Sequence, residues 1–226
     1  MKYLPSVFVA IAIALTSCGS NGTSVRSENK DSLQLVVDSY RNTDIMLSFK
    51  GLKVGDSLSI DSNGLYGDSI KLYPIDEYTY QGCVSIPYMD GDGKKRTEFP
   101  NIHVDVLKGR IAKISILSES WGLCKFFIET FNDRYYKKEP VESGGLGRYN
   151  ETYFWTFKTQ SIIINRKYHL DPQHRIYHIT DSVLIAYAHD AMAKTLDSIF
   201  TKRDSLKRDE NRKRIENETK QLRENI

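Results

Sequence analysis

Side chains that could bind a calcium ion lie together in the segment Asp90-Gly-Asp-Gly-Lys94. Placing Asp90 and Asp92 at the third and fifth ligand positions of a calcium-binding loop puts Tyr88 at the first position and Phe99 at the last. Neither Tyr88 nor Phe99 can supply the missing carboxylate. We therefore interpret the segment as a hairpin loop, in which aspartate and glycine favour the turn.

Imidazole side chains crowd around a turn at Asp171-Pro172, where His169, His174 and His178 occur close together. If two strands pair about this turn, His169 and His178 share one face with Lys167 and Thr180, and that face should be solvent-exposed. Zinc needs three or four converging ligands, and neither a His-Glu-x-x-His motif nor a cysteine pair is present. We predict surface histidines, and we assign no metal or other cofactor.

Catalytic motifs are equally weak. Gly144-Gly-Leu-Gly-Arg148 lacks the lysine and hydroxyl that end a phosphate-binding loop, so we interpret it as a mobile surface loop. Cys124 falls near a predicted helix start, but its apolar neighbours should raise the thiol pKa and make it a poor nucleophile. No Gly-x-Ser-x-Gly motif occurs, and a carboxylate pair for glycoside hydrolysis cannot be selected without distances. We assign no catalytic residue.

The first residues have the organisation of an export signal. Lys2 is followed by an apolar run, Val7–Leu15, that at about 1.5 Å per residue spans roughly 14 Å, well short of the ~30 Å bilayer core. The next residues complete Leu15-Thr16-Ser17-Cys18, which resembles the bacterial lipobox. The resemblance implies cleavage before Cys18, acylation of its thiol with chains such as palmitate, and a membrane anchor. The alternative is an ordinary signal peptide with an incidental cysteine.

The residues after Cys18 bear on the localisation of the mature protein. Gly19 rather than aspartate follows the cysteine, and no acidic cluster occurs in Gly19–Thr23. In lipoproteins that share this motif, these features imply the outer membrane and a periplasm-facing position. Residues 18–30 are rich in glycine, serine and asparagine, which predicts a flexible tether.

Composition is typical of a globular domain, with 40% hydrophobic and 27% charged residues. We expect residues 31–200 to form a single domain, since this length can bury one good core. Loss of residues 1–17 removes Lys2 alone among the charges, so the formal charge falls from +3 to +2. A formal charge so close to zero does not favour binding to a polyanion, so we expect no nucleic-acid partner.

Two cysteines, Cys83 and Cys124, remain after lipidation of Cys18, in a compartment that permits disulfides. The pattern of Tyr78–Ile86 puts Cys83 on the polar face of a strand, whereas Cys124 belongs to an apolar stripe on a helix. The pattern favours two free thiols, and a disulfide between them remains the alternative.

The order of elements predicts an α+β fold, a mostly antiparallel sheet covered by one helix, with a long charged C-terminal helix. Helical spacing occurs at 33–40, and a helix is expected over 120–138, stopped before Pro140. Residues 142–150 read as a loop. Alternating patterns predict strands at 44–49, 70–73, 77–88, 102–107, 111–117, 152–158, 162–170 and 175–189.

The last strand has a competing interpretation, because Thr180, Asp181 and Ser182 are acceptable helix caps for Val183–Ala188. The β-branched and aromatic content of that run favours a strand, with the helix starting near Asp190.

Residues 201–226 form a predicted charged helical tail. Four pairs there place an acid four residues before a base, a spacing that stabilises an exposed helix: Asp204 with Arg208, Asp209 with Lys213, Glu210 with Arg214, and Glu216 with Lys220. We expect a solvated helix. A helix that docks an envelope protein partner or self-associates is the alternative.

Asp-Ser followed by an aliphatic residue recurs, and the triplet resembles an O-glycosylation acceptor of exported proteins in certain Gram-negative anaerobes. The candidate hydroxyls are those of Ser32, Ser57, Ser69, Ser182, Ser198 and Ser205. The competing interpretation is that these pairs only cap helices and start turns.

Two functional hypotheses remain. The first is a non-catalytic, lipid-anchored envelope protein that binds or supports another component through its sheet or its tail. The second is a hydrolase that acts on envelope polymers or imported glycans.

Overall fold

The structure is a computed structural model that describes residues 34–60, 64–66, 70–145, 147–170 and 178–224. Contacts divide the chain into two compact units, residues 1–35 and 36–226, and the described residues from 36 onward belong to the second. The predicted signal peptide, Cys18 and the tether lie outside the described residues.

The described part of the second unit is α+β, as predicted. Its helices, beyond a helical segment over residues 36–41, are α2 (Trp121–Arg134) and α3 (Asp190–Glu224). Its strands are β1 (Ser48–Phe49), β2 (Leu52–Lys53), β3 (Leu65–Tyr66), β4 (Ile70–Pro74), β5 (Thr79–Cys83), β6 (Ile86–Met89), β7 (Lys95–Glu98), β8 (Asn101–Leu107), β9 (Arg110–Ser118), β10 (Val141–Gly145), β11 (Arg148–Thr156), β12 (Gln160–Leu170) and β13 (His178–His189).

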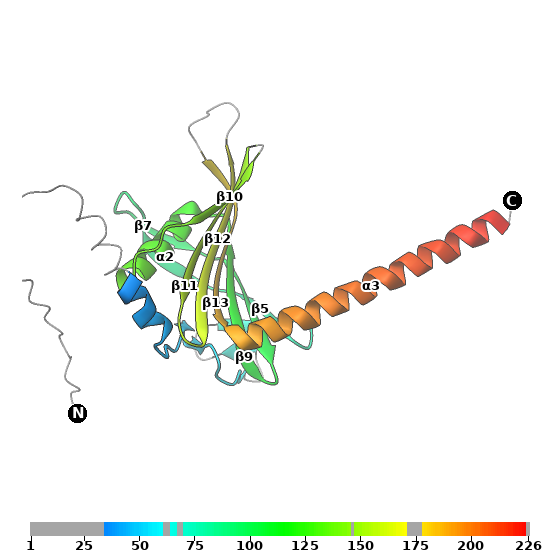
Figure 1. Ribbon diagram of the computed structural model, residues 1–226, viewed down its shortest axis with the longest axis horizontal. Helices are drawn as coiled ribbons and strands as arrows, with labels where there is room; N and C mark the ends of the chain where they lie inside the picture. Colours follow the sequence, from blue (N-terminus) through cyan, green and yellow to red (C-terminus); the bar gives the residue numbers. More distant parts are fainter. Residues whose placement is uncertain (1–33, 61–63, 67–69, 146, 171–177, 225–226) are drawn as a thin grey trace, which may run out of the picture. The chain divides into compact units, whose positions relative to one another are not determined.

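Nine of these strands form one antiparallel sheet in the order β10-β11-β12-β13-β9-β8-β5-β4-β3. Most neighbours in the sheet are joined by short connections, as in a meander, whereas β13 returns to pair with β9 after the α2 and β10–β12 segment. Two small hairpins, β1–β2 and β6–β7, stand apart from the large sheet. Figure 1 shows α2 on one side of the strands and α3 leaving on the other.

One face of the sheet carries the main core beneath α2. The side chain of Ser120 caps this helix by accepting a hydrogen bond from the backbone N–H of Leu123 (3.1 Å). The Phe131 ring lies 5.3 Å from the Trp155 ring and 5.8 Å from the Tyr187 ring, centroid to centroid. Aromatic side chains therefore fill the space between helix and sheet, where such pairs add to the hydrophobic effect.

A buried glutamine attaches the N-terminal hairpin to this core. The amide of Gln160 accepts a hydrogen bond from the backbone N–H of Leu47 (2.7 Å) and donates one to the carbonyl of Val54 (3.3 Å). Each polar group of this side chain is thus matched by a main-chain group, which offsets the cost of burying it.

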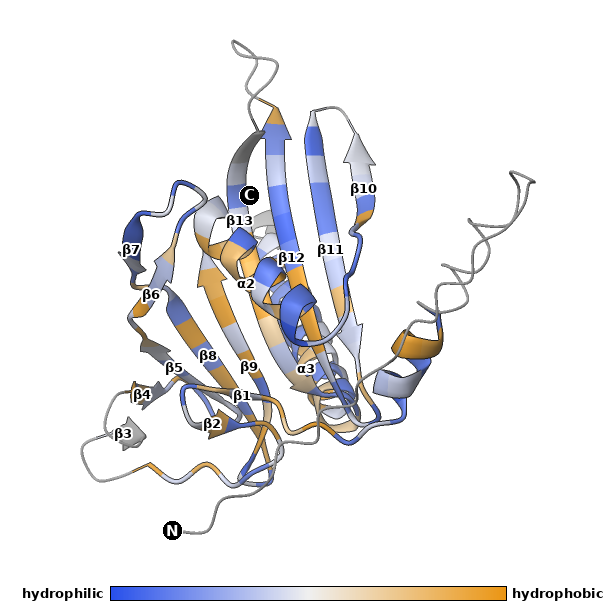
Figure 2. Cartoon of the chain, turned by 90° about the vertical axis from the view of Figure 1, so that its left-hand side faces the viewer, coloured by the Kyte–Doolittle hydropathy of each residue, from blue (hydrophilic) through white to orange (hydrophobic). Residues whose placement is uncertain are grey.

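The opposite face of the sheet packs on the first turns of α3. Leu196 is 1% exposed, and α3 contacts β8, β9 and β13. Figure 2 shows α2 in front of these strands and α3 behind them. Tertiary contacts further along α3 are the Phe200 ring against Tyr78 (6.1 Å) and Arg203 Nη1 against Asp76 Oδ2 (2.8 Å). Residues 204–221 are exposed at every position.

The strand–helix boundary at Asp190 is confirmed, since β13 ends at His189 and α3 begins at the next residue. The exposed part of α3 carries two ion pairs that were not among those predicted: Arg212 pairs with Asp209 (3.0 Å) and Arg214 with Glu218 (3.8 Å). On a solvated helix such pairs form and exchange at little cost, so their identity matters less than their number.

Three predicted boundaries are wrong. The strand expected over 77–88 is broken, because the chain leaves the large sheet after Cys83 and starts the separate β6–β7 hairpin. The strand expected over 44–49 is reduced to β1, which pairs only with β2. The helix expected to reach residue 138 ends at Arg134.

The loop expected over 142–150 is also wrong, because β10 and β11 pair across most of it. Gly144 adopts a φ of +131°, and a Cβ there would lie 2.4 Å from the carbonyl oxygen of Arg148. Glycine is therefore required at this position for strand pairing, and the richness in glycine that suggested a loop instead permits a close hairpin.

Candidate functional site

The aspartate-rich segment at residues 90–94 is the tip of the β6–β7 hairpin, as predicted. Asp90 accepts hydrogen bonds from the backbone N–H groups of Asp92 (3.1 Å) and Lys94 (2.9 Å) and pairs with Arg96 (2.9 Å). The Arg96 side-chain hydrogen bond is the largest influence that lowers the pKa of Asp90. The carboxylate thus stabilises the turn from within.

The histidines do not form the arrangement expected from sequence. A bulge between Lys167 and Tyr168 pairs His169 with Ile179 and Leu170 with His178, so the positions of His169 and His178 fall on opposite faces of the hairpin. His174 lies outside the described residues. Within the described part of the chain, no group of three metal-ligating side chains occurs.

The two cysteines are both free thiols, as the sequence pattern favoured: Cys83 is exposed and Cys124 is buried. Burial raises the pKa of the Cys124 thiol to about 12. A thiol of that pKa is protonated in neutral solution and is a poor nucleophile.

Four of the candidate glycosylation serines, Ser57, Ser182, Ser198 and Ser205, have exposed side chains. The other two, Ser32 and Ser69, lie outside the described residues. Exposure is compatible with modification at those four positions, which stays a prediction.

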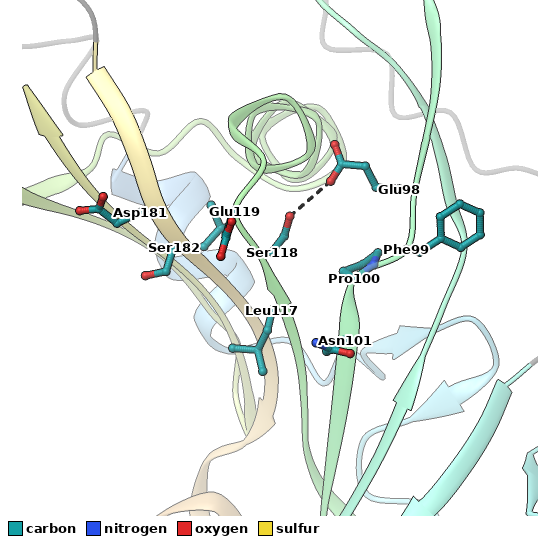
Figure 3. Close-up of a pocket in the computed structure, with 10 residues that line it drawn as sticks. Glu98, Phe99, Pro100, Asn101, Leu117, Ser118, Glu119, Asp181 and Ser182 are labelled. Atoms are coloured by element: carbon teal, nitrogen blue, oxygen red, sulfur yellow. Dashed lines mark hydrogen bonds between the residues drawn. The ribbon is translucent and has the colours of Figure 1, made fainter. Parts of the chain in front are cut away.

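A cleft of about 420 Å³ opens where β9 leaves the sheet (Figure 3). We call it the acidic cleft, and its lining comes from the end of β9, the start of β13 and the segment that joins β7 to β8. The residues are Glu98, Phe99, Pro100, Asn101, Leu117, Ser118, Glu119, Asp181, Ser182 and Val183.

Glu98 is held in place on one side of the acidic cleft. Its carboxylate accepts hydrogen bonds from the hydroxyls of Tyr88 (2.6 Å) and Ser118 (3.3 Å). Burial is the largest influence that raises the pKa of Tyr88, so this phenol stays protonated and able to donate. Ser118 Oγ in turn accepts from the backbone N–H of Ser120 (3.0 Å), which fixes the hydroxyl at the start of α2.

Asp181 reaches the acidic cleft from the other side, out of the bulge in β13. The register pairs Thr180 with Tyr168 and Ser182 with Lys167, which leaves Asp181 as the extra residue. Bulges re-aim a side chain relative to the regular strand. One carboxylate oxygen of Asp181 lies 2.6 Å from His169 Nδ1. The third acid, Glu119, is exposed just before the helix cap.

The charged residues in the lining of the acidic cleft are Glu98, Glu119 and Asp181. Asp181 also lines a neighbouring pocket together with Arg148 and Lys167, so cationic residues lie close to this carboxylate. Across the described residues, neither Glu98 nor Glu119 takes part in an ion pair with a lysine or arginine. Glu98 and Glu119 therefore present negative charge on a chain whose formal net charge is +3.

A second group of polar residues is buried on the α2 face of the same strands. The Arg166 guanidinium, in a residue 4% exposed, lies between the rings of Trp121 (3.9 Å to the centroid) and Tyr168 (4.3 Å). It contacts Glu151 Oε2 (3.3 Å) and donates to Thr180 Oγ1 (3.0 Å). A charge buried this way is matched on every side, which is typical of a structural ion pair.

Sequence reasoning missed both groups. Arg166 could have been found, since it occupies an inward position of the alternation Ile162, Ile164, Arg166, Tyr168. The three carboxylates of the acidic cleft come from distant parts of the chain, and no spacing connects them.

Comparison of the chain with protein-family models, with curated proteins and with solved structures finds no match. In the described part of the chain, none of the helices combines the length and the apolar character needed to cross a bilayer.

Proposed function

We propose that this chain is a lipid-anchored protein of the cell envelope, held at the outer membrane and facing the periplasm, where it binds or supports another envelope component without catalysis. The anchoring half of the proposal rests on Leu15-Thr16-Ser17-Cys18 and the apolar run before it. Acyl chains on Cys18 would bind the membrane stably only when more than one is present.

The binding half rests on one observation, the uneven covering of the sheet. On the α3 side, Leu117, Leu184 and Ile163 are only partly buried and Phe154 is 40% exposed. Register places them in two cross-strand pairs, Leu117 with Leu184 and Ile163 with Phe154. The two pairs are diagonal neighbours, since Leu184 itself pairs with Asn165, two residues along β12 from Ile163. We call this set the open face. Contiguous apolar residues left on a surface commonly mark a protein interaction site.

The exposed part of α3, residues 204–221, offers a second surface for an envelope protein partner. Leu206 and Ile215 are 56% and 57% exposed there, among charged neighbours. At about 1.5 Å per residue this part extends roughly 27 Å, which gives the chain reach beyond the sheet.

A hydrolase that acts on envelope polymers or imported glycans is the second candidate function. It is favoured by the three carboxylates that line the acidic cleft, because glycoside hydrolysis uses a pair of acids. A Glu98→Gln and Glu119→Gln double variant would abolish hydrolysis of such polymers if this candidate were correct, and a binding factor would show no hydrolysis to lose.

Two experiments test the main proposal. Cys18→Ala should move the protein from the membrane fraction to the soluble fraction, and retention on membranes after a high-salt wash would contradict lipid anchoring.

Affinity purification from detergent-solubilised envelopes should recover a defined partner with the unchanged chain. A Leu184→Asp variant that still folds should lose that partner, and equal recovery by both chains would contradict binding through the open face.

A further inference from the structure

We infer that a pocket beside the bulge in β13 binds a sugar that carries a carboxylate. The pocket has a volume of about 310 Å³, and its lining comes from β10, β11, β12 and β13. We call it the bulge pocket, and its charged and amide side chains are those of Arg148, Asn150, Lys167 and Asp181. It is a different site from the open face, so the inference goes beyond the proposed function.

Strand register puts these four side chains on one side of the sheet. In the pairing of β11 with β12, Asn150 is opposite Lys167 and Arg148 is opposite His169. Each of these residues lies an even number of positions along its strand from a residue of the open face, so all of them share that side. Asp181 reaches the same side, since its carboxylate lies 2.6 Å from His169 Nδ1.

Two cations in the bulge pocket are available to a ligand. Arg148 and Lys167 are exposed, and neither forms an ion pair within the described part of the chain. The carboxylate of Asp181 is already engaged by His169. A carboxylate on a ligand can accept hydrogen bonds from both cations, and such charge-assisted bonds are stronger than neutral ones. Part of the ligand should therefore be acidic.

The Asn150 side chain gives independent evidence for a ligand. Its oxygen Oδ1 is buried and has no hydrogen-bond partner among the described residues. A buried acceptor left unpaired destabilises a fold, and such groups are rare in folded proteins. A hydroxyl or amide of a ligand in the pocket can donate to this oxygen. The ligand should therefore carry donors as well as a carboxylate.

This combination favours a sugar acid over a simple anion or an amino acid. A simple carboxylate brings acceptors alone, which leaves Asn150 Oδ1 unmatched. The ammonium group of an amino acid could donate to that oxygen, but Arg148 and Lys167 would repel it. Sugar hydroxyls donate without carrying charge. The pocket volume of about 310 Å³ lies within the range of small-molecule sites, about 300 to 1,000 Å³.

The test compares two sugars that differ in one group. N-acetylmuramic acid carries a carboxylate on a lactyl ether, and N-acetylglucosamine has a hydroxyl at the same position. Ligand-observed NMR titration with the full chain in a non-ionic detergent gives the two dissociation constants. We expect N-acetylmuramic acid to bind about tenfold more tightly, because it alone forms the charge-assisted hydrogen bonds.

Three variants assign the contacts. Lys167→Gln should weaken binding of N-acetylmuramic acid about tenfold and leave N-acetylglucosamine unaffected. Asn150→Ala should weaken binding of both sugars about threefold. Lys202→Gln removes an equal charge from the exposed surface of α3 and should change neither. Thermal unfolding of each variant shows whether it folds.

The inference would be overturned by any of three results: equal binding of the two sugars, equal weakening by Lys202→Gln, or displacement of N-acetylmuramic acid by lactate at matching concentration. The last result would identify a site for carboxylates alone. Recovery of a partner through the open face, with no sugar binding, would refute this inference and leave the proposed function standing. Sugar binding without such a partner would contradict the proposed function alone.

Discussion

The two faces of the large sheet are built differently. On the α2 face, Phe131, Trp155 and Tyr187 pack ring against ring and bury one another. On the α3 face, the helix covers only the end of the sheet near Leu196, and Phe154 and Leu184 remain accessible to solvent. The first face resembles the interior of any stable domain. The second leaves apolar side chains accessible, and we propose that a partner binds there.

With the binding role that we propose for the open face, the contrast separates the residues that stabilise the fold from those that bind a partner. A face that already buries its apolar side chains can gain little from a partner, whereas a half-covered face gains the free energy of burying the remainder. Substitutions on the α2 face should therefore unfold the protein, and substitutions on the open face should change binding while the fold persists.

The difference between the two faces should be largest in the reactivity of their thiols. Cys83 lies on the same face as Leu117, through its pairing with Asn101, whereas Cys124 is buried under α2 with its pKa raised to about 12. In a Cys18→Ala chain, a disulfide reagent such as DTNB should label Cys83 at least about a hundredfold faster than Cys124. Prompt labelling of both thiols without denaturant would show that the α2 face is not closed.

Removing a ring from the α2 face should cost most stability. Phe131→Ala leaves a cavity among Phe127, Trp155 and Tyr187, and we expect a loss of about 3 to 5 kcal/mol in the free energy of unfolding. Phe154→Ala on the open face is the matched control and should cost less than about 1.5 kcal/mol. Urea unfolding measures both, and similar losses would remove the distinction between the faces.

The buried ion pair between Arg166 and Glu151 should make the next largest contribution to the free energy of unfolding. Glu151→Gln leaves the Arg166 guanidinium buried without its counter-charge, so we expect a loss of about 3 kcal/mol. An Arg166→Met and Glu151→Leu double variant should recover much of that loss, because it removes the unpaired charge. A single variant as stable as the unchanged chain in urea would mean that the pair is solvated.

The exposed part of α3 should contribute little to the fold. Deletion of residues 205–226 keeps Leu196, Phe200 and Arg203, and should change the free energy of unfolding by less than about 0.5 kcal/mol. A large destabilisation in thermal unfolding would show that these residues pack on the domain.

The smallest effect concerns the pH dependence at the point where α3 leaves the sheet. The Arg203 side-chain hydrogen bond is the largest influence that lowers the pKa of Asp76 below 3.8. A carboxyl with a depressed pKa adds stability above its unfolded value, and that contribution disappears as pH falls through the folded value. Asp76→Asn should therefore be less stable at pH 7 and decline less steeply below about pH 4, as measured by urea unfolding at each pH.

Local chemistry made parts of the fold predictable. The β-branched run from Val183 ends where Asp190 begins a helix, and Ser120 caps α2 where the apolar stripe starts. These features depend on neighbours in the sequence, so the sequence alone reveals them.

The features that were missed depend on contacts between distant segments. The alternation through Val84 and Ile86 continues without a break, yet the backbone N–H of Val84 bonds to the carbonyl of Pro100 and the chain passes into another hairpin. Likewise, the pairing of β13 with β9 is what brings Glu98, Glu119 and Asp181 to one cleft. No local sequence pattern predicts that these side chains line the same cleft.

Site-specific photocrosslinking in living cells tests the open face most directly. A photoreactive amino acid at position 184 on the open face should give a discrete adduct with one envelope protein, and the same residue at position 125, exposed on α2, should not. Adducts of equal yield at both positions, or none at position 184 in a folded and membrane-bound chain, would contradict the account.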